Sequence, residues 1–148
     1  MLPKIKTFDE LTTRELYEIL RSRAEIFVVE QDCVYQDLDC KDYYSWHVFC
    51  ENDDGRVSAY LRLFWRDEEK KTLQLGRVIT LVHGTGLGGK LLHAGMEYAK
   101  NVLKAESVYL EAQTYAVGYY QKEDFRVLTG EIITVDNLPH VAMGWGNI

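Results

Sequence analysis

The sequence is poor in cysteine, in clustered basic residues and in long apolar runs. Its three cysteines, Cys33, Cys40 and Cys50, are an odd number without C-x-x-C spacing, so we expect free thiols in a reducing compartment. No apolar run approaches membrane-spanning length, and residues 1–7 lack the apolar core of a signal peptide. These absences predict a cytoplasmic protein with no membrane partner.

Basic residues are also outnumbered by acidic ones. The chain has 17 Lys and Arg against 23 Asp and Glu, a formal net charge of −6. Such a chain repels phosphate backbones, so nucleic acid is not an expected partner. The remaining composition is ordinary for a globular protein, 47% apolar and 27% charged over 148 residues, with no repeat or linker. We therefore expect a single domain over residues 1–148.

Hydrophobic periodicity predicts helices interleaved with strands. Thr12 and Glu15 form a capping-box pattern that opens a helix over about 13–29. Strands are expected over 46–51, 57–65, 72–80 and 107–113, the first of them half-buried. The apolar positions of the first helix recur at helical spacing, at Leu16, Leu20, Ala24 and Phe27.

A second helix and the C-terminal elements follow. A short helix is expected over 115–122, and a closing pair of strands over 125–134 and 140–145. Helices that alternate with strands indicate an α/β domain with a mixed sheet, not a bundle or a sandwich. The apolar stripe of the second helix comprises Leu87, Leu91, Gly95, Tyr98, Ala99 and Val102.

A glycine-rich loop joins the strand that ends at Thr80 to the second helix. Residues 84–90 read Gly-Thr-Gly-Leu-Gly-Gly-Lys. Glycines let the backbone approach a ligand, and the first N–H groups of the helix point at the loop. Together with the helix dipole, these groups make an anion site suited to phosphate. A P-loop would need Ser or Thr after Lys90 to hold magnesium, and Leu91 stands there instead.

A Rossmann fingerprint is the second pattern that the loop fits. Gly84, Gly86 and Gly89 satisfy G-x-G-x-x-G, and Glu111 ends the next strand as a ribose-binding acid would. The position of the loop argues against this alternative. Fewer than forty residues follow Glu111, too few to complete a dinucleotide-binding fold.

The third pattern is that of the GNAT superfamily, whose pyrophosphate loop has the form Q/R-x-x-G-x-G/A. His83, Gly86 and Gly88 occupy these positions, with His in place of Arg or Gln. Residues 119–125, Tyr-Tyr-Gln-Lys-Glu-Asp-Phe, resemble the F-Y-x-K-x-G-F segment near the end of GNAT domains. Asp124 replaces Gly there, which is tolerable because Asp enters left-handed backbone conformations more readily than most residues.

The resemblance covers nearly the whole chain and is most specific to the ElaA-like branch of the superfamily. It implies the GNAT acyl-CoA N-acyltransferase fold, a twisted mixed sheet flanked by helices and open between its middle strands. The segments that carry it, in chain order, are Arg23–Gln31, Tyr35–Asp39, His47, Gly76–Val78, Ala112–Gln113, Leu138–His140 and Met143.

What the resemblance implies about activity is transfer of acetyl from acetyl-CoA to an amine, by direct attack in a ternary complex. Tyr120 is implied as the general acid near the CoA sulfur, and Glu30, Glu111 and His140 are the candidate bases. A homodimer is expected by analogy alone. The residues expected to bind the cofactor are Val78, Ile79, Thr80, His83, Gly84, Thr85, Gly86, Leu87, Gly88, Gly89, Lys90, Gln113 and Tyr120.

Two arginines leave alternatives open. Arg23 and Arg77 could pair with acids of the 30–42 region and shape the acceptor pocket together with Glu30 and His140, or they could brace the first helix. A non-catalytic CoA-binding sensor also remains as an alternative to an enzyme.

The remaining polar residues are expected to be structural. His47, in the middle of a strand, is expected to fill a packing role. Asp37, Asp39 and Asp42 are expected to form a solvated loop, and no metal site is predicted.

Overall fold

The computed structural model describes residues 2–31 and 36–148, so the expectations for Cys33 and Tyr35 lie outside the described residues. An eight-stranded mixed sheet forms its centre, in the order β1-β2-β3-β4-β5-β8-β6, with β7 paired to β8. Every neighbouring pair is antiparallel except β4 and β5. The strands are β1 Lys4–Thr7, β2 Trp46–Glu51, β3 Val57–Asp67, β4 Thr72–Thr80, β5 Ser107–Gln113, β6 Arg126–Val127, β7 Ile133–Val135 and β8 Leu138–Gly146.

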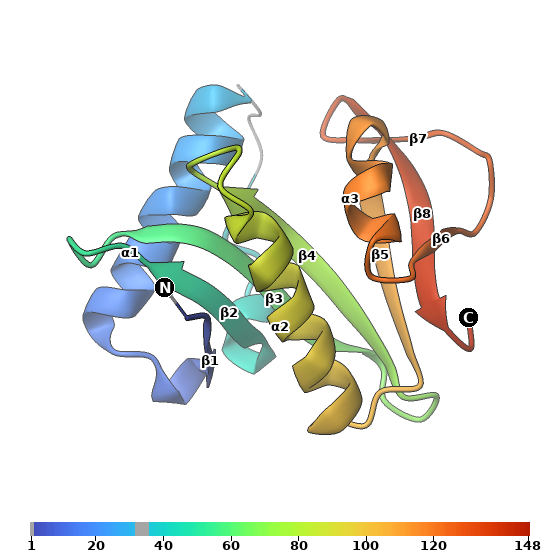
Figure 1. Ribbon diagram of the computed structural model, residues 1–148, viewed down its shortest axis with the longest axis horizontal. Coiled ribbons are helices and arrows are strands. Elements are labelled where there is room, and N and C mark those ends of the chain that lie inside the picture. Colours follow the sequence, from blue (N-terminus) through green and yellow to red (C-terminus); the bar gives the residue numbers. More distant parts are fainter. Residues whose placement is uncertain (1, 32–35) are drawn as a thin grey trace.

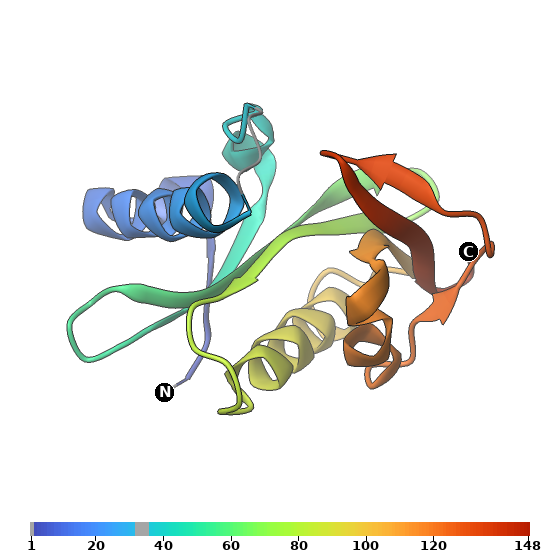
Figure 2. The same cartoon turned by 90° about the horizontal axis from the view of Figure 1, so that it is seen from above.

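Helices cover both faces of this sheet. Figure 2 shows α1 on one face and α2 and α3 on the other. The α-helices are α1 Thr13–Ala24, α2 Leu87–Asn101 and α3 Val117–Gln121. A π-helical turn, η2 Glu25–Glu30, continues α1, and 3-10 turns occur at η1 Phe8–Glu10, η3 Lys41–Tyr44 and η4 Thr114–Ala116. The expected mixed α/β fold is confirmed. Among the described helices, none is long and apolar enough to cross a membrane.

The central strands are buried on both faces. Val48 and Leu61 pack in the cluster on the α2 side, whereas Phe49 and Tyr60 pack in the cluster on the α1 side. Because both faces are covered, the expectation of a half-buried strand over 46–51 is wrong.

The buried face of α1 is rotated from the predicted one. The capping box is confirmed, since the Glu15 backbone N–H donates to Thr12 Oγ1 at 3.0 Å. However, Ala24 is exposed, and polar side chains take its place in the interior. Ser22 can be buried because its hydroxyl donates to the Val57 carbonyl at 2.6 Å. The buried residues of α1 and its π-helical turn are Glu15, Ile19, Ser22, Arg23 and Ile26.

Other differences lie in α2 and at the two ends of the chain. The stripe of α2 includes Leu92 and Met96, while Val102 is 58% exposed and follows the end of the helix. Residues 125–134 form the separate strands β6 and β7 and not one strand. Strand β1, which sequence analysis did not predict, pairs with β2.

The middle of the sheet is open on one side. Strands β4 and β5 pair in parallel only over Thr72–Gln74 and Ser107–Tyr109, and then diverge (Figure 1). A bulge accompanies the divergence on the other side of β4. Arg62 of β3 lies opposite Gly76, but Tyr60 lies opposite Ile79, so β4 carries one extra residue.

Candidate active site

A cleft of about 820 Å³ lies where β4 and β5 diverge. Its walls come from η2 and β4 on one side and from β5, α3 and β8 on the other, and the loop before α2 closes one end. Three of the predicted site residues, Thr85, Lys90 and Arg23, do not line it. The structure brings the other predicted residues together around the cleft: Glu30, Arg77, Val78, Ile79, Thr80, His83, Gly84, Gly86, Leu87, Gly88, Gly89, Glu111, Gln113, Tyr120 and His140.

The glycine loop forms the N-terminal end of α2. Gly84 and Gly86 have φ angles of +79° and +78°, a region that side chains with a Cβ rarely adopt. The first bond within the helix runs from Lys90 N–H to Gly86 C=O at 3.1 Å. The N–H groups of Gly88 and Gly89 precede that bond, so the helix leaves them to the cleft. This end of the cleft can hold an anion such as phosphate.

A tyrosine from α3 fixes the position of this loop. The Tyr119 hydroxyl donates to the Gly88 carbonyl at 2.6 Å. A Cβ at Gly88 would lie 3.2 Å from Thr80 Cγ2 and 3.5 Å from Tyr119 Cε1, so the close approach of α2, β4 and α3 favours glycine. Sequence analysis did not assign Tyr119 a role of its own.

The edge of β4 that faces the cleft parts from β5 after Gln74. Within the described part of the chain, no strand pairs with this edge beyond Gln74. The bulge sets Arg77, with φ at +52°, and Val78 opposite the single residue Leu61. Those N–H and C=O groups of Val78–Thr80 that point away from β3 are therefore on the edge that faces an extended ligand.

Tyr120 stands on the opposite wall of the cleft. Its side chain is 7% exposed and packs edge-on against Tyr119 and Phe125, with centroid distances of 4.9 and 6.0 Å. No hydrogen bond to its hydroxyl occurs among residues 2–31 and 36–148. Burial raises the pKa of Tyr120 above its ordinary value of 10, so the phenol keeps its proton at neutral pH. It is therefore a proton donor that has no acceptor among the residues that the structure describes.

His140 lies on β8, in the same cleft. Its side chain is 8% exposed, and its Nδ1 is 2.9 Å from the Leu138 carbonyl. A carbonyl only accepts, so Nδ1 carries the proton of the neutral ring and Nε2 is left as the acceptor. Among the described residues, Nε2 has no hydrogen-bond partner. The register of the sheet pairs His140 with Gln113 of β5.

Glu30 and Glu111 face the cleft from its two walls. Glu30 ends the π-helical turn η2 and is exposed. Glu111 is an exposed residue of β5, and the Tyr109 hydroxyl lies 3.4 Å from its Oε2. Neither carboxylate forms an ion pair with a described residue.

An ion cluster lies beside the cleft on its α1 side. Arg77 Nε lies 2.8 Å from Asp37 Oδ1, and Arg77 Nη2 lies 3.3 Å from Asp39 Oδ2. Arg23 is fully buried and pairs with Asp37 at 3.1 Å and with Asp42 at 2.7 Å. Both arginines pair with acids of the 30–42 region, which is one of the two alternatives left open for them. Arg77 lines the cleft, whereas Arg23 lies behind it and ties α1 to these acids.

Arg62 is a member of this cluster that sequence analysis missed. It is 3% exposed and bonds Asp39 at 2.6 Å and Asp42 at 3.0 Å. The signal was similar to that for Arg77, an arginine flanked by apolar residues within a strand.

The acidic loop is therefore not solvated, and that expectation is wrong. Burial opposes ionisation of Asp39 and Asp42, but hydrogen bonds and the charges of the arginines outweigh it and lower the pKa of both carboxyls. No group of three or more His, Cys, Asp or Glu within the described ranges could hold a metal ion.

His47 lies behind the cluster, away from the cleft. It is fully buried, with Nδ1 at 2.7 Å from the Tyr60 hydroxyl and Nε2 at 2.9 Å from the Asp42 carbonyl. Burial lowers the pKa of His47. The expectation of a structural histidine is confirmed.

Comparisons with known proteins agree with this geometry. Residues 10–146 match the acetyltransferase (GNAT) domain family. The chain is 33% identical to ElaA of Escherichia coli over 138 residues, which cover 90% of this chain and 89% of that protein. The crystal structure of E. coli ElaA is similar with a TM-score of 0.88 at 31% identity, covering 96% of this chain and 97% of the other. An acyl-CoA N-acyltransferase from Pseudomonas aeruginosa is similar with a TM-score of 0.85 at 33% identity, covering 97% and 99%.

The dinucleotide-binding alternative is wrong, because the sheet has one parallel pair where a Rossmann fold has parallel strands throughout. The glycine loop, the divergent strands and the relatives at more than 30% identity all lead to one assignment. The chain belongs to the GNAT family of acetyltransferases, in the branch that contains ElaA.

Proposed function

We propose that this protein is an acetyl-CoA-dependent N-acetyltransferase that transfers acetyl directly to an amine. The observation that carries the proposal is the cleft itself. The N-terminal end of α2, the bulged edge of β4, the hydroxyl of Tyr120 and a histidine Nε2 without a partner among the described residues all face one space. These are the groups that amine attack on a thioester requires.

The cofactor-binding groups of the proposal come mainly from the backbone. The N–H groups of Gly88 and Gly89 would hold the pyrophosphate, and the edge of β4 at Val78–Thr80 would pair with the pantetheine arm. One N–H group of the bulged segment would donate to the thioester oxygen as charge develops there. A preorganised donor of this kind is worth roughly 3 kcal/mol.

Two side chains carry the proton transfers. His140 Nε2 accepts a proton from the amine, either directly or through a water, as the nitrogen bonds to the carbonyl carbon. As the carbon–sulfur bond breaks, Tyr120 gives its proton to the departing sulfur. The products are the N-acetylated amine and free CoA. We favour His140 over Glu30 and Glu111 as the base because its ring is buried and held in one tautomer.

The proposal also retains the cytoplasm as the location. The free thiols of Cys40 and Cys50 are compatible with a reducing compartment. Homodimerisation stays a prediction.

Thermal unfolding in the presence of acetyl-CoA, CoA, NAD or ATP tests the cofactor first. A ligand at 100 times its dissociation constant adds about 2.7 kcal/mol to the free energy of unfolding. We expect the melting temperature to rise with acetyl-CoA and CoA and to stay constant with NAD and ATP. Amine-dependent release of the CoA thiol then tests transfer. Stable CoA binding without transfer to any amine would favour the sensor alternative.

A further inference from the structure

We infer that the acceptor is a small linear amine with at least two ammonium groups. One nitrogen reacts beside His140, and a second is held by the carboxylates of Glu30 and Glu111. This inference rests on the proposed N-acetyltransferase function and names the substrate class of the same cleft.

The register of β5 and β8 places the acceptor-side groups on one face of the sheet. Residues of β5 alternate, so Leu110 and Ala112 pack in the core on the α2 side while Glu111 and Gln113 point to the opposite face. His140 pairs directly with Gln113, and paired residues point to the same side. Glu111 and His140 therefore share the face of the sheet on which α1 lies, opposite to the glycine loop and α2.

On the α1 face of the sheet, the accessible charges that line the cleft include the carboxylates of Glu30 and Glu111. Arg77 is the cationic side chain on the β4 wall, but it is already bound to Asp37 and Asp39. Glu30 and Glu111 are exposed to the cleft without an ion pair among the described residues. An acceptor with a carboxylate would be repelled by these two groups, whereas an ammonium would be attracted.

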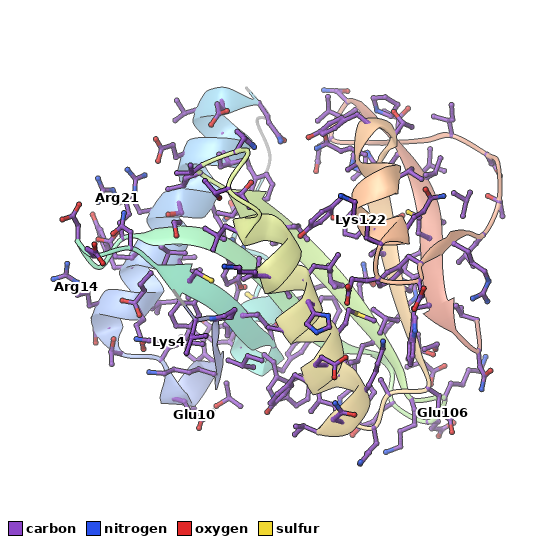
Figure 3. The ribbon with its side chains drawn as sticks, in the orientation of Figure 1. Lys4, Glu10, Arg14, Arg21, Glu106 and Lys122 are labelled. Carbon is purple, nitrogen blue, oxygen red and sulfur yellow. The ribbon has the colours of Figure 1, made fainter. Side chains whose placement is uncertain are left out.

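The other cation on the lining, Lys122, lies on the side of the phosphate end. It follows α3, the helix that lies on the α2 face (Figure 3). Its neighbour Glu123 is 3.1 Å from His93 of α2. Lys122 is therefore placed to assist the anion site and not the acceptor.

The space between the charged groups suits a short hydrocarbon chain. Phe27 from the π-helical turn and Leu138 from β8 line the cleft and are partly buried. His140 adds an observation that is independent of the carboxylates. The side chain of His140 is almost wholly buried and held by the bond at Nδ1, while Nε2 has no partner among the described residues and stays accessible from the cleft. A reacting amine fits there, joined by methylene groups to a distal ammonium.

Three amines of similar length test the inference. The probes are 1,4-diaminobutane, 1-aminobutane, which lacks the distal charge, and 4-aminobutanoate, which reverses it. Initial rates of CoA release give kcat/KM for each at one pH and one ionic strength. We expect 1,4-diaminobutane to exceed 1-aminobutane by about tenfold or more, as expected for about 1.4 kcal/mol of extra binding. We expect 4-aminobutanoate to be the poorest acceptor.

Variants connect the preference to the two carboxylates. In Glu30→Gln with Glu111→Gln, the ratio of kcat/KM between diamine and monoamine should fall towards one. Glu69→Gln, an exposed carboxylate in the turn between β3 and β4, is the matched control and should keep the ratio. A CoA-induced rise in melting temperature in every variant shows that the fold and the anion site are intact.

The outcomes separate the two proposals. A monoamine that reacts as well as the diamine, a zwitterion that reacts better, or a ratio that survives both substitutions would overturn the inference and leave the N-acetyltransferase function standing. A lysine-bearing peptide that clearly outperforms the diamine would replace the small-amine class. Absence of CoA binding together with absence of transfer would remove the proposed function and the inference with it.

Discussion

On its α2 face the sheet buries an almost purely apolar cluster, whereas on its α1 face it buries arginines, aspartates and a histidine. Leu61, Leu91 and Met96 are typical of the first face. On the second face, Ile19 and Phe49 form a small apolar cluster beside the ion network of Arg23, Arg62 and Arg77. The cleft opens between these two environments.

The difference separates two kinds of recognition. The proposed anion end lies next to the apolar face and would use backbone N–H groups, in a loop whose geometry glycine permits. The proposed acceptor end lies next to the ionic face and would use side chains from η2, β5 and β8. On this proposal, cofactor binding would depend on main-chain shape, and acceptor choice would depend on side-chain identity.

The largest expected effect is on the ionic face. Arg23→Ala leaves Asp42 buried without its closest cation, so the free energy of unfolding should fall by about 3–5 kcal/mol. Arg21→Ala on the same helix is the control, because Arg21 is half exposed, points outward in Figure 3 and pairs with no described residue except Glu18. It should cost less than about 1 kcal/mol. Urea titration measures both, and equal losses would show that the ion network stabilises nothing.

The next largest expected effect is on kcat, through the proposed general acid in the cleft. Tyr120→Phe should lower kcat by about 100-fold, the contribution of a general acid, and should leave the dissociation constant of acetyl-CoA nearly unchanged. Tyr17→Phe, at an exposed tyrosine of α1, should keep full activity. Steady-state rates and acetyl-CoA titration decide, and an unchanged kcat removes Tyr120 from the mechanism.

CoA binding at the glycine loop should weaken when the backbone geometry of the loop changes, even if no charge changes. Gly86→Ala places a Cβ at a φ of +78°, which costs roughly 1–2 kcal/mol of stability and should weaken CoA binding. Gly118→Ala, in α3, has open space around its Cβ position and no positive φ, so it should not destabilise the fold. Calorimetry of CoA binding compares the two. Wild-type affinity in Gly86→Ala would mean that the loop geometry does not set phosphate binding.

The smallest expected effect is on the pH dependence of stability, to which the titratable groups of the α1 face contribute. Burial lowers the pKa of His47. Below about pH 6.5 the unfolded chain therefore binds a proton at His47 that the folded chain does not bind, and the free energy of unfolding falls as the pH decreases. The lowered pKa values of Asp39 and Asp42 contribute to the free energy of unfolding above about pH 3.8, and this contribution is lost at lower pH.

Urea titration between pH 8 and pH 3 measures this profile. His47→Gln should flatten its upper part, while Met96→Leu on the apolar face should lower the whole profile without altering its shape. A similar change of shape in both variants would contradict the assignment to His47.

Sequence reasoning predicted the parts of the molecule that depend on local rules. The glycine loop, the Thr12–Glu15 capping box and the left-handed Asp124, with φ at +66°, each follow from one short segment. Strand β4 was predicted with its observed bounds because turn residues flank it on both sides.

The parts that could not be predicted need distant partners. Arg23 belongs to the interior only because Asp37 and Asp42 return to it from another segment, and no local rule for α1 contains that information. The four residues of β1 are a strand because β2 offers them an edge. The face shared by Glu111 and His140 likewise depends on the register between β5 and β8.

The three residue pairs that join β4 to β5 have a consequence for how the domain moves. Strands β1 to β4 and strands β5 to β8 form two half-sheets that are joined by few hydrogen bonds, so a ligand in the cleft would bridge them where β4 and β5 diverge. We expect amide hydrogen exchange at Leu75–Thr80 to slow on CoA binding, while the β2–β3 ladder exchanges as before. The cofactor would then complete the sheet as a non-protein strand and restrict the motion of one half-sheet relative to the other.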